Sequence, residues 1–168
     1  MSNQSDYTPE EWKTISAGPV MAGLLVSSAD MSGPIGLVKE AWAVSKAFME
    51  SASSAPNELI KTISEAIKAR GGKPDMPDLP SDSAGIGKAL IEGCRQAVAV
   101  VSSKSPAEAD EYKKWLVSIA TRTAGASKEG GILGFGGTLV SEAESSAISE
   151  LASALGVSSD RNIPGTQA

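Results

Sequence analysis

The chain has 168 residues, 41% of them hydrophobic, so it is long enough to bury one sizeable core and is expected to form one domain. Its 20 acidic and 15 basic residues give a formal net charge of -5, and the absence of a Lys/Arg cluster argues against nucleic acid as a partner. Cys94 is the only cysteine and histidine is absent, which excludes an internal disulfide, Ser-His-Asp or Cys-His catalysis, and histidine metal sites.

The first residues, from Met1 to Asp6, lack the basic and apolar regions of a secretory signal. No apolar stretch approaches the roughly 18 residues that a membrane span requires. We therefore expect a cytoplasmic protein without a membrane span.

The first helix signal is Thr8-Pro9-Glu10-Glu11, which combines a hydroxyl cap, a proline in the first turn and a returning glutamate. This pattern predicts a helix that begins at Pro9. Gly18-Pro19 is expected to break that helix, because proline removes a backbone donor and clashes with the preceding turn. A second helical segment is then expected from Val20 to Asp30.

Two further helices are expected in the first half of the chain. After Ser32-Gly33-Pro34-Ile35-Gly36, apolar residues at three- and four-residue intervals predict a long helix between Leu37 and Ala52. A short amphipathic helix is expected to start at Pro56 and to stop at Gly71-Gly72.

Residues 71–82 contain three prolines and are the predicted linker between two halves, 1–70 and 83–157. The next helix is expected to follow a cap at Ser81 or Asp82. Its run Ala97-Val98-Ala99-Val100-Val101 could be read as a strand, but it continues a helical period and is predicted to be helical.

Two more capping boxes mark the last helices. Ser105-Pro106-Ala107-Glu108 opens a helix, and Ser141-Glu142-Ala143-Glu144 opens another that Gly156 should end. Residues 158–168 are expected to form a flexible tail. The three tryptophans are expected to be mainly core residues. The predicted fold is an all-α, single-domain bundle of five to seven helices.

The glycine hinge, residues 130–137, lies between the last two predicted helices and reads Gly-Gly-Ile-Leu-Gly-Phe-Gly-Gly. Glycines leave backbone uncovered, while Ile132, Leu133 and Phe135 prefer burial, so this hinge is expected to be packed or bound against something. It lacks the Gly-Lys-Ser/Thr ending of a phosphate loop. A weak pseudo-twofold repeat of helix, glycine hinge and helix is possible, although convergence of capped helices explains the same pattern.

Acidic residues flank the two glycine-rich segments and suggest an alternative function. They could supply oxygen ligands to a divalent cation such as calcium or magnesium if the two segments lie side by side. These acids are equally explained as helix first-turn residues or as solvent-exposed residues. We prefer this structural interpretation, which involves no cofactor. The candidate metal ligands are Asp30, Glu40, Glu129, Glu142 and Glu144.

Two stretches carry a family resemblance. Residues 111–116, 128–137 and 140–144, together with 9–12, 29–34 and 39–40, resemble a small, uncharacterised family of bacterial all-helical proteins. A more remote resemblance is to the TerB-like domains of tellurite resistance. It rests on the order of a helix rich in small residues, an acidic residue, glycines and a helix that begins with glutamate. That second resemblance implies a stress-response domain whose acidic residues bind metal.

The leading functional hypothesis is a non-catalytic cytoplasmic module. It would bind a partner protein, a second copy or an apolar ligand through Ile132, Leu133 and Phe135. The alternative is a TerB-like stress-response domain that binds a divalent cation. A carboxylate-based hydrolase is the third hypothesis and would require two acids with displaced pKa values in one cleft.

Overall fold

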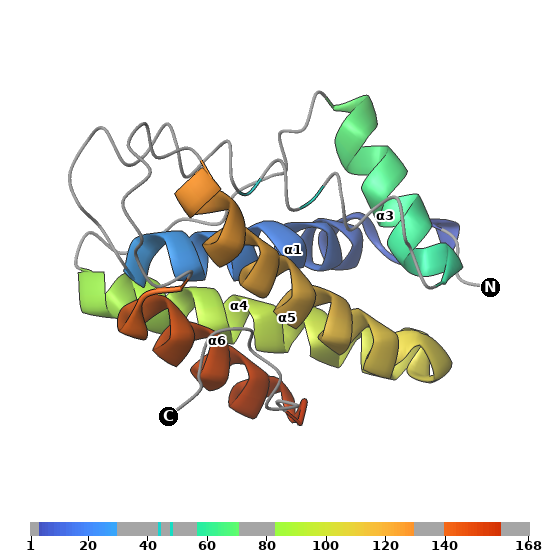
Figure 1. Cartoon of the computed structure of the whole chain (residues 1–168). Helices are drawn as coiled ribbons and strands as arrows, with labels where there is room; N and C mark the ends of the chain where they lie inside the picture. The colour runs from blue at the N-terminus through green and yellow to red at the C-terminus, as the bar shows by residue number, and fades with distance from the viewer. Residues whose placement is uncertain are drawn as a thin grey trace.

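The structure is a computed structural model that describes residues 4–29, 44, 48, 57–70, 83–129 and 140–158. All regular elements within these ranges are helical (Figure 1). They are the short 3-10 helix η1 (Gln4–Asp6) and the α-helices α1 (Pro9–Ala29), α3 (Glu58–Ala69), α4 (Ser83–Lys104), α5 (Pro106–Glu129) and α6 (Glu142–Leu155). Val44 and Phe48 are also helical and buried. The predicted all-α bundle is confirmed.

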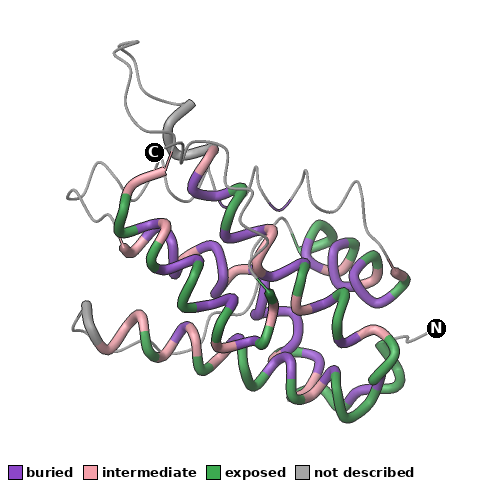
Figure 2. The backbone as a smooth tube through the Cα atoms, turned by 60° about the horizontal axis from the view of Figure 1, so that its bottom comes forward, coloured by how far each residue is buried: buried purple, intermediate pink, exposed green. Residues whose placement is uncertain are grey.

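The buried apolar side chains of the described helices form one continuous core. Figure 2 shows that buried and exposed residues alternate along the described helices, as expected for helices with one face in a core. Residues before and after the predicted linker contribute to this core, although the linker itself, residues 71–82, lies outside the described residues.

Most of the predicted helix ends agree with the structure. α1 begins at Pro9, and its capping box is formed, because Glu11 N donates to Thr8 Oγ1 at 3.2 Å and Thr8 N donates to Glu11 Oε2 at 2.8 Å. α6 has the capping box expected at Ser141 and Glu144. Gly156 ends α6 with a φ of 67°, in the left-handed region that glycine adopts without strain.

Other local predictions need correction. α3 begins at Glu58 after the cap Asn57, two residues later than the expected start at Pro56. α5 begins at Pro106 as predicted. However, Ser105 N donates to Val101 O at 2.7 Å and not to the Glu108 carboxylate, as a capping box would require. The physical reason is that α5 follows α4 directly, and the last turn of α4 already uses that donor.

α4 is helical throughout Ser83–Lys104, so the helical interpretation of residues 97–101 is confirmed over the strand. It runs antiparallel to α1: Leu25 lies beside Gly87, and Met21 lies against Gly93. The close approach of Met21 is possible because Gly93 has no side chain.

α1 is the central helix and packs chiefly on α4 and α5. α5 runs in the same direction as α1. Tyr112, in the second turn of α5, contacts Gly18 near the middle of α1, and further along both helices Thr123 lies beside Gly23. α1 therefore occupies the groove of the α4–α5 hairpin along much of its length.

The predicted break at Gly18-Pro19 is wrong, because α1 continues through both residues to Ala29. Proline at position 19 has no N–H to donate to the carbonyl of Ile15, four residues earlier. The hydroxyl of Tyr112 supplies that donor and bonds Ile15 O at 2.7 Å. A side chain from α5 thus replaces the missing helical hydrogen bond, which is why the helix survives its proline.

Gly18 makes this replacement possible. A side-chain Cβ at position 18 would collide with the Tyr112 hydroxyl and would lie 3.3 Å from Ala97 Cβ. The glycine and the proline therefore act together. Pro19 leaves the Ile15 carbonyl without its helical donor, and Gly18 leaves room for the Tyr112 hydroxyl that bonds this carbonyl.

We expect Gly18→Ala to destabilise the fold by about 2–4 kcal/mol, because the added methyl displaces Tyr112 and leaves Ile15 O without a donor. Gly125→Ala is the matched control, since no atom of the described residues lies within 4 Å of a Cβ at this helical position. It should stabilise by about 0.5–1 kcal/mol. Urea denaturation measures both, and a neutral Gly18→Ala would contradict the packing described here.

A double-mutant cycle tests the Tyr112 bond itself. Tyr112→Phe should cost about 1–3 kcal/mol in the natural sequence, but roughly 1 kcal/mol less in a Pro19→Ala background, where the backbone N–H gained at position 19 can bond Ile15 O. Tyr7→Phe is the control, because the Tyr7 hydroxyl pairs with Ser105 Oγ and not with α1 near Pro19. The loss of stability caused by Tyr7→Phe should be the same in both backgrounds. Equal costs of Tyr112→Phe in both backgrounds would refute the replacement.

Candidate functional site

The predicted contact residues Ile132, Leu133 and Phe135 lie outside the described residues, as does the rest of the glycine hinge. The helices on either side of it are described. Figure 1 shows the C-terminal ends of α1 and α5 and the N-terminal ends of α4 and α6 in the left half of the bundle. The chain thus leaves α5 and enters α6 at the end of the bundle where α1 also ends.

The candidate metal ligands are only partly described. Asp30 and Glu40 lie outside the described residues, and Glu129 is the last residue of α5, with a side chain that is not described. Glu142 is exposed in the first turn of α6. Glu144 is buried, and its carboxylate accepts a hydrogen bond from Ser141 N at 2.8 Å. Within the described ranges, no three Cys, Asp or Glu residues are grouped so that they could hold a metal ion.

Two nucleophilic side chains, Cys94 and Tyr112, lie in the interior and bond backbone carbonyls of α1 in the turn before Pro19. Cys94 Sγ donates to Gly18 O at 3.7 Å and is completely buried. Burial raises the pKa of the Cys94 thiol to about 12, because the thiolate would lose its hydration. Burial also raises the pKa of Tyr112 well above its ordinary value. Both groups are therefore protonated at neutral pH and suited to packing and hydrogen bonding rather than to nucleophilic attack.

Aromatic residues pack around Tyr112 and at the beginning of α1. The ring of Tyr112 lies 5.9 Å from that of Trp115, which also contacts Phe48 at 6.2 Å. Trp12 pairs with Tyr7 at 5.9 Å. The prediction that at least two tryptophans are core residues is confirmed by Trp12 and Trp115, both 4% exposed, whereas Trp42 is outside the described residues.

Polar contacts join the beginning of α1 to the junction of α4 and α5. Tyr7 Oη lies 2.7 Å from Ser105 Oγ, and Lys104 Nζ lies 3.3 Å from Glu11 Oε2. The hydrogen bond from Thr8 N lowers the pKa of Glu11, and Lys104 lowers it further. These contacts fix the end of the bundle opposite to the one where α5 ends and α6 begins (Figure 1).

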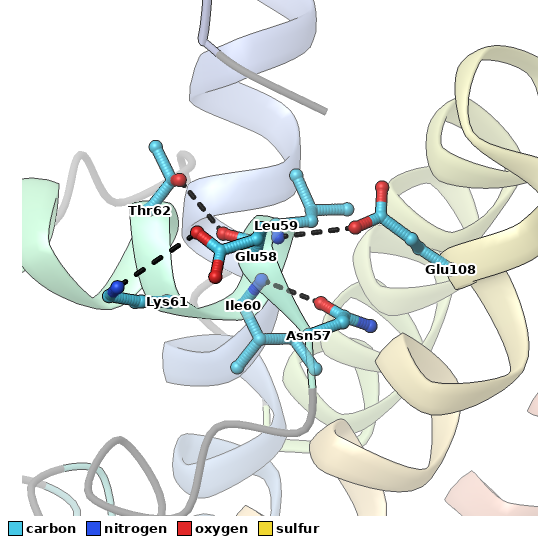
Figure 3. Close-up of polar contacts among 7 residues, drawn as sticks. All are labelled: Asn57, Glu58, Leu59, Ile60, Lys61, Thr62 and Glu108. Atoms are coloured by element: carbon cyan, nitrogen blue, oxygen red, sulfur yellow. Dashed lines mark hydrogen bonds and ion pairs between the residues drawn. The ribbon is translucent and has the colours of Figure 1, made fainter. Parts of the chain in front are cut away.

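A second polar cluster joins α3 to α5 (Figure 3). Asn57 Oδ1 accepts from Ile60 N at 3.0 Å, as an ordinary helix cap does. Leu59 N donates to Glu108 Oε1 at 3.3 Å, and Asn57 Nδ2 donates to Glu111 Oε2 at 2.7 Å. We call Glu108 and Glu111 the carboxylate clamp.

Sequence reasoning missed the carboxylate clamp and assigned Glu108 to the cap of its own helix. The local signal is the same in both cases, namely a glutamate three residues after a serine. Only the tertiary position of Asn57, 54 residues before Glu111, decides where the carboxylates bind. Lys113 Nζ lies 3.3 Å from Asp110 Oδ1 on the same helix.

Comparisons with known proteins give no match: no family model, no curated protein and no solved structure resembles this chain. The resemblances based on sequence motifs therefore stay predictions. Among the described helices, none is both long enough and apolar enough to cross a membrane.

The buried thiol predicts loss of stability at alkaline pH. The folded state keeps the Cys94 proton up to about pH 12, whereas an unfolded thiol releases its proton near its ordinary pKa of 9.0. Because the unfolded state then binds fewer protons, the free energy of unfolding should fall as pH rises through this window, by up to about 1.4 kcal/mol per pH unit. Tyr112 adds a decrease of the same sign at higher pH.

Urea denaturation of the natural protein and of Cys94→Ala between pH 8 and 11 measures this decrease. The variant should show a shallower dependence on pH above pH 9. Parallel curves for the two proteins would show that the thiol does not contribute to the pH dependence.

Proposed function

We propose that this chain is a non-catalytic helical module that binds a partner protein or an apolar ligand through its glycine hinge. Ile132, Leu133 and Phe135 would be the contact residues. Three large apolar side chains among five glycines within eight residues combine apolar contact area with uncovered backbone. Such a combination favours binding to another molecular surface over chemistry.

The position of the flanking helices supports this proposal. α5 and α6 both bury their apolar faces in the common core, with Leu116, Ile119 and Leu151 fully buried. The two helices are therefore anchored on either side of the hinge, and their adjoining ends lie at one end of the bundle (Figure 1). An anchored segment loses less conformational entropy on binding than a free chain does.

The non-catalytic part of the proposal is supported by the state of the described nucleophiles. Cys94 and Tyr112 are buried, protonated and engaged in hydrogen bonds to α1 carbonyls. Their role is to complete the core around Pro19.

Phe135→Ala tests the proposal. If Phe135 is a contact residue, the variant should bind an apolar dye, 8-anilinonaphthalene-1-sulfonate, at least several-fold more weakly, and should melt at the same temperature as the natural protein. A core role predicts instead a loss of about 3–5 kcal/mol in stability. Fluorescence titration and thermal melting measure the two effects.

Val117→Ala is the matched control, because Val117 is a half-buried apolar residue on the body of α5. It should leave dye binding unchanged. The same pair of variants can be compared as baits in affinity capture from cell extract, where a protein retained by Val117→Ala and lost from Phe135→Ala identifies a partner of the hinge. Unchanged dye binding and unchanged capture by Phe135→Ala would refute the proposal.

A further inference from the structure

α3 depends on the rest of the bundle for its helical structure. It has 12 residues, and an isolated helix of this length is marginal in water because nucleation is costly. Its apolar face, formed by Leu59, Ile60, Ile63 and Ile67, is buried. Folding of α3 and its docking onto the bundle are therefore coupled.

The first turn of α3 obtains part of its capping from another helix. The amide of Leu59 has no carbonyl partner within α3, since it belongs to the first turn. Glu108 accepts its hydrogen, and Glu111 holds the side chain of the cap residue Asn57. Glu58, the acidic residue in the first turn of α3, lies instead toward Lys61, 3.9 Å away. The carboxylate clamp also places negative charge at the positive end of the α3 dipole.

Two features make α3 easier to release than the other described helices. Among the described helices, α3 packs chiefly on α1, whereas α1, α4, α5 and α6 pack on one another, and Figure 1 shows α3 at the edge of the bundle. Its inner face also buries the hydroxyl of Ser64, which is 2% exposed and has no hydrogen-bond partner among the described residues. A buried hydroxyl without a partner opposes docking.

We propose that α3 opens and closes as a unit separate from the rest of the bundle, and that the carboxylate clamp of Glu108 and Glu111 holds it closed. Opening uncovers the aliphatic face of α3 and the part of α1 beneath it. This is a conformational device distinct from the glycine hinge, and it does not depend on the function proposed for that segment. Elements of this kind open at a lower free energy than the whole fold.

Amide hydrogen exchange of the full chain, resolved by helix, tests this inference. Glu108→Ala combined with Glu111→Ala removes both acceptors, and the amides of α3 should exchange about ten-fold faster or more. Glu108→Gln combined with Glu111→Gln keeps acceptor oxygens but removes the charge, and should give a smaller increase. The amides of α4 and α6 should be unchanged in both variants.

Two further variants fix the interpretation. Asp110→Asn is the matched control, because this exposed acid lies between the clamp residues in sequence and pairs with Lys113 rather than with α3. It should leave α3 exchange unchanged. Ser64→Ala removes the buried hydroxyl and should slow the exchange of α3.

Two results would overturn the proposal. Equal acceleration in all helices of the clamp variants would show that α3 opens only when the whole chain unfolds. An increase no larger than that of Asp110→Asn would show that the carboxylates do not hold α3. Because none of these variants touches residues 130–137, either failure leaves the proposed function of the glycine hinge untouched.

Discussion

The hydrogen bond from the Tyr112 hydroxyl to the Ile15 carbonyl is the contact on which the arrangement of the bundle depends. A proline inside a helix ordinarily leaves an unsatisfied carbonyl in the preceding turn, and such a group is costly to bury. Here it is buried in the core and satisfied by α5. The same ring requires a glycine at position 18, so the hydrogen bond and the glycine together fix which part of α1 faces Tyr112.

Two other sets of polar side chains join helices at their ends. Ser105 and Lys104 hold the beginning of α1, while Glu108 and Glu111 hold the beginning of α3. All four residues lie within the stretch 104–111, at the α4–α5 junction. This short stretch of sequence positions two other helices, and the apolar faces of those helices then supply the buried area of the core.

The helices could be predicted from the sequence where their signals are local. Capping at Thr8 and Ser141, the stop at Gly156 and the apolar period of α5 each involve residues within a few positions of one another. The predictions at Pro19 and Glu108 were wrong because the partners of these residues are distant in sequence. A proline indicates a helix break unless another part of the chain supplies the missing donor. A glutamate three residues after a serine indicates a local cap unless the end of another helix lies closer. The predicted contact residues of the hinge were chosen from composition, and the described residues test only the position of the helices around them.

The separation of 97 residues between Ile15 and Tyr112 also has a kinetic consequence. Contacts between adjacent helices such as α4 and α5 close short loops, whereas bringing α1 into their groove closes a long one at a larger entropic cost. We therefore expect the α4–α5 hairpin to form early in folding. Insertion of α1, in which the Ile15 carbonyl comes to bond the Tyr112 hydroxyl, would then be a late step of the pathway.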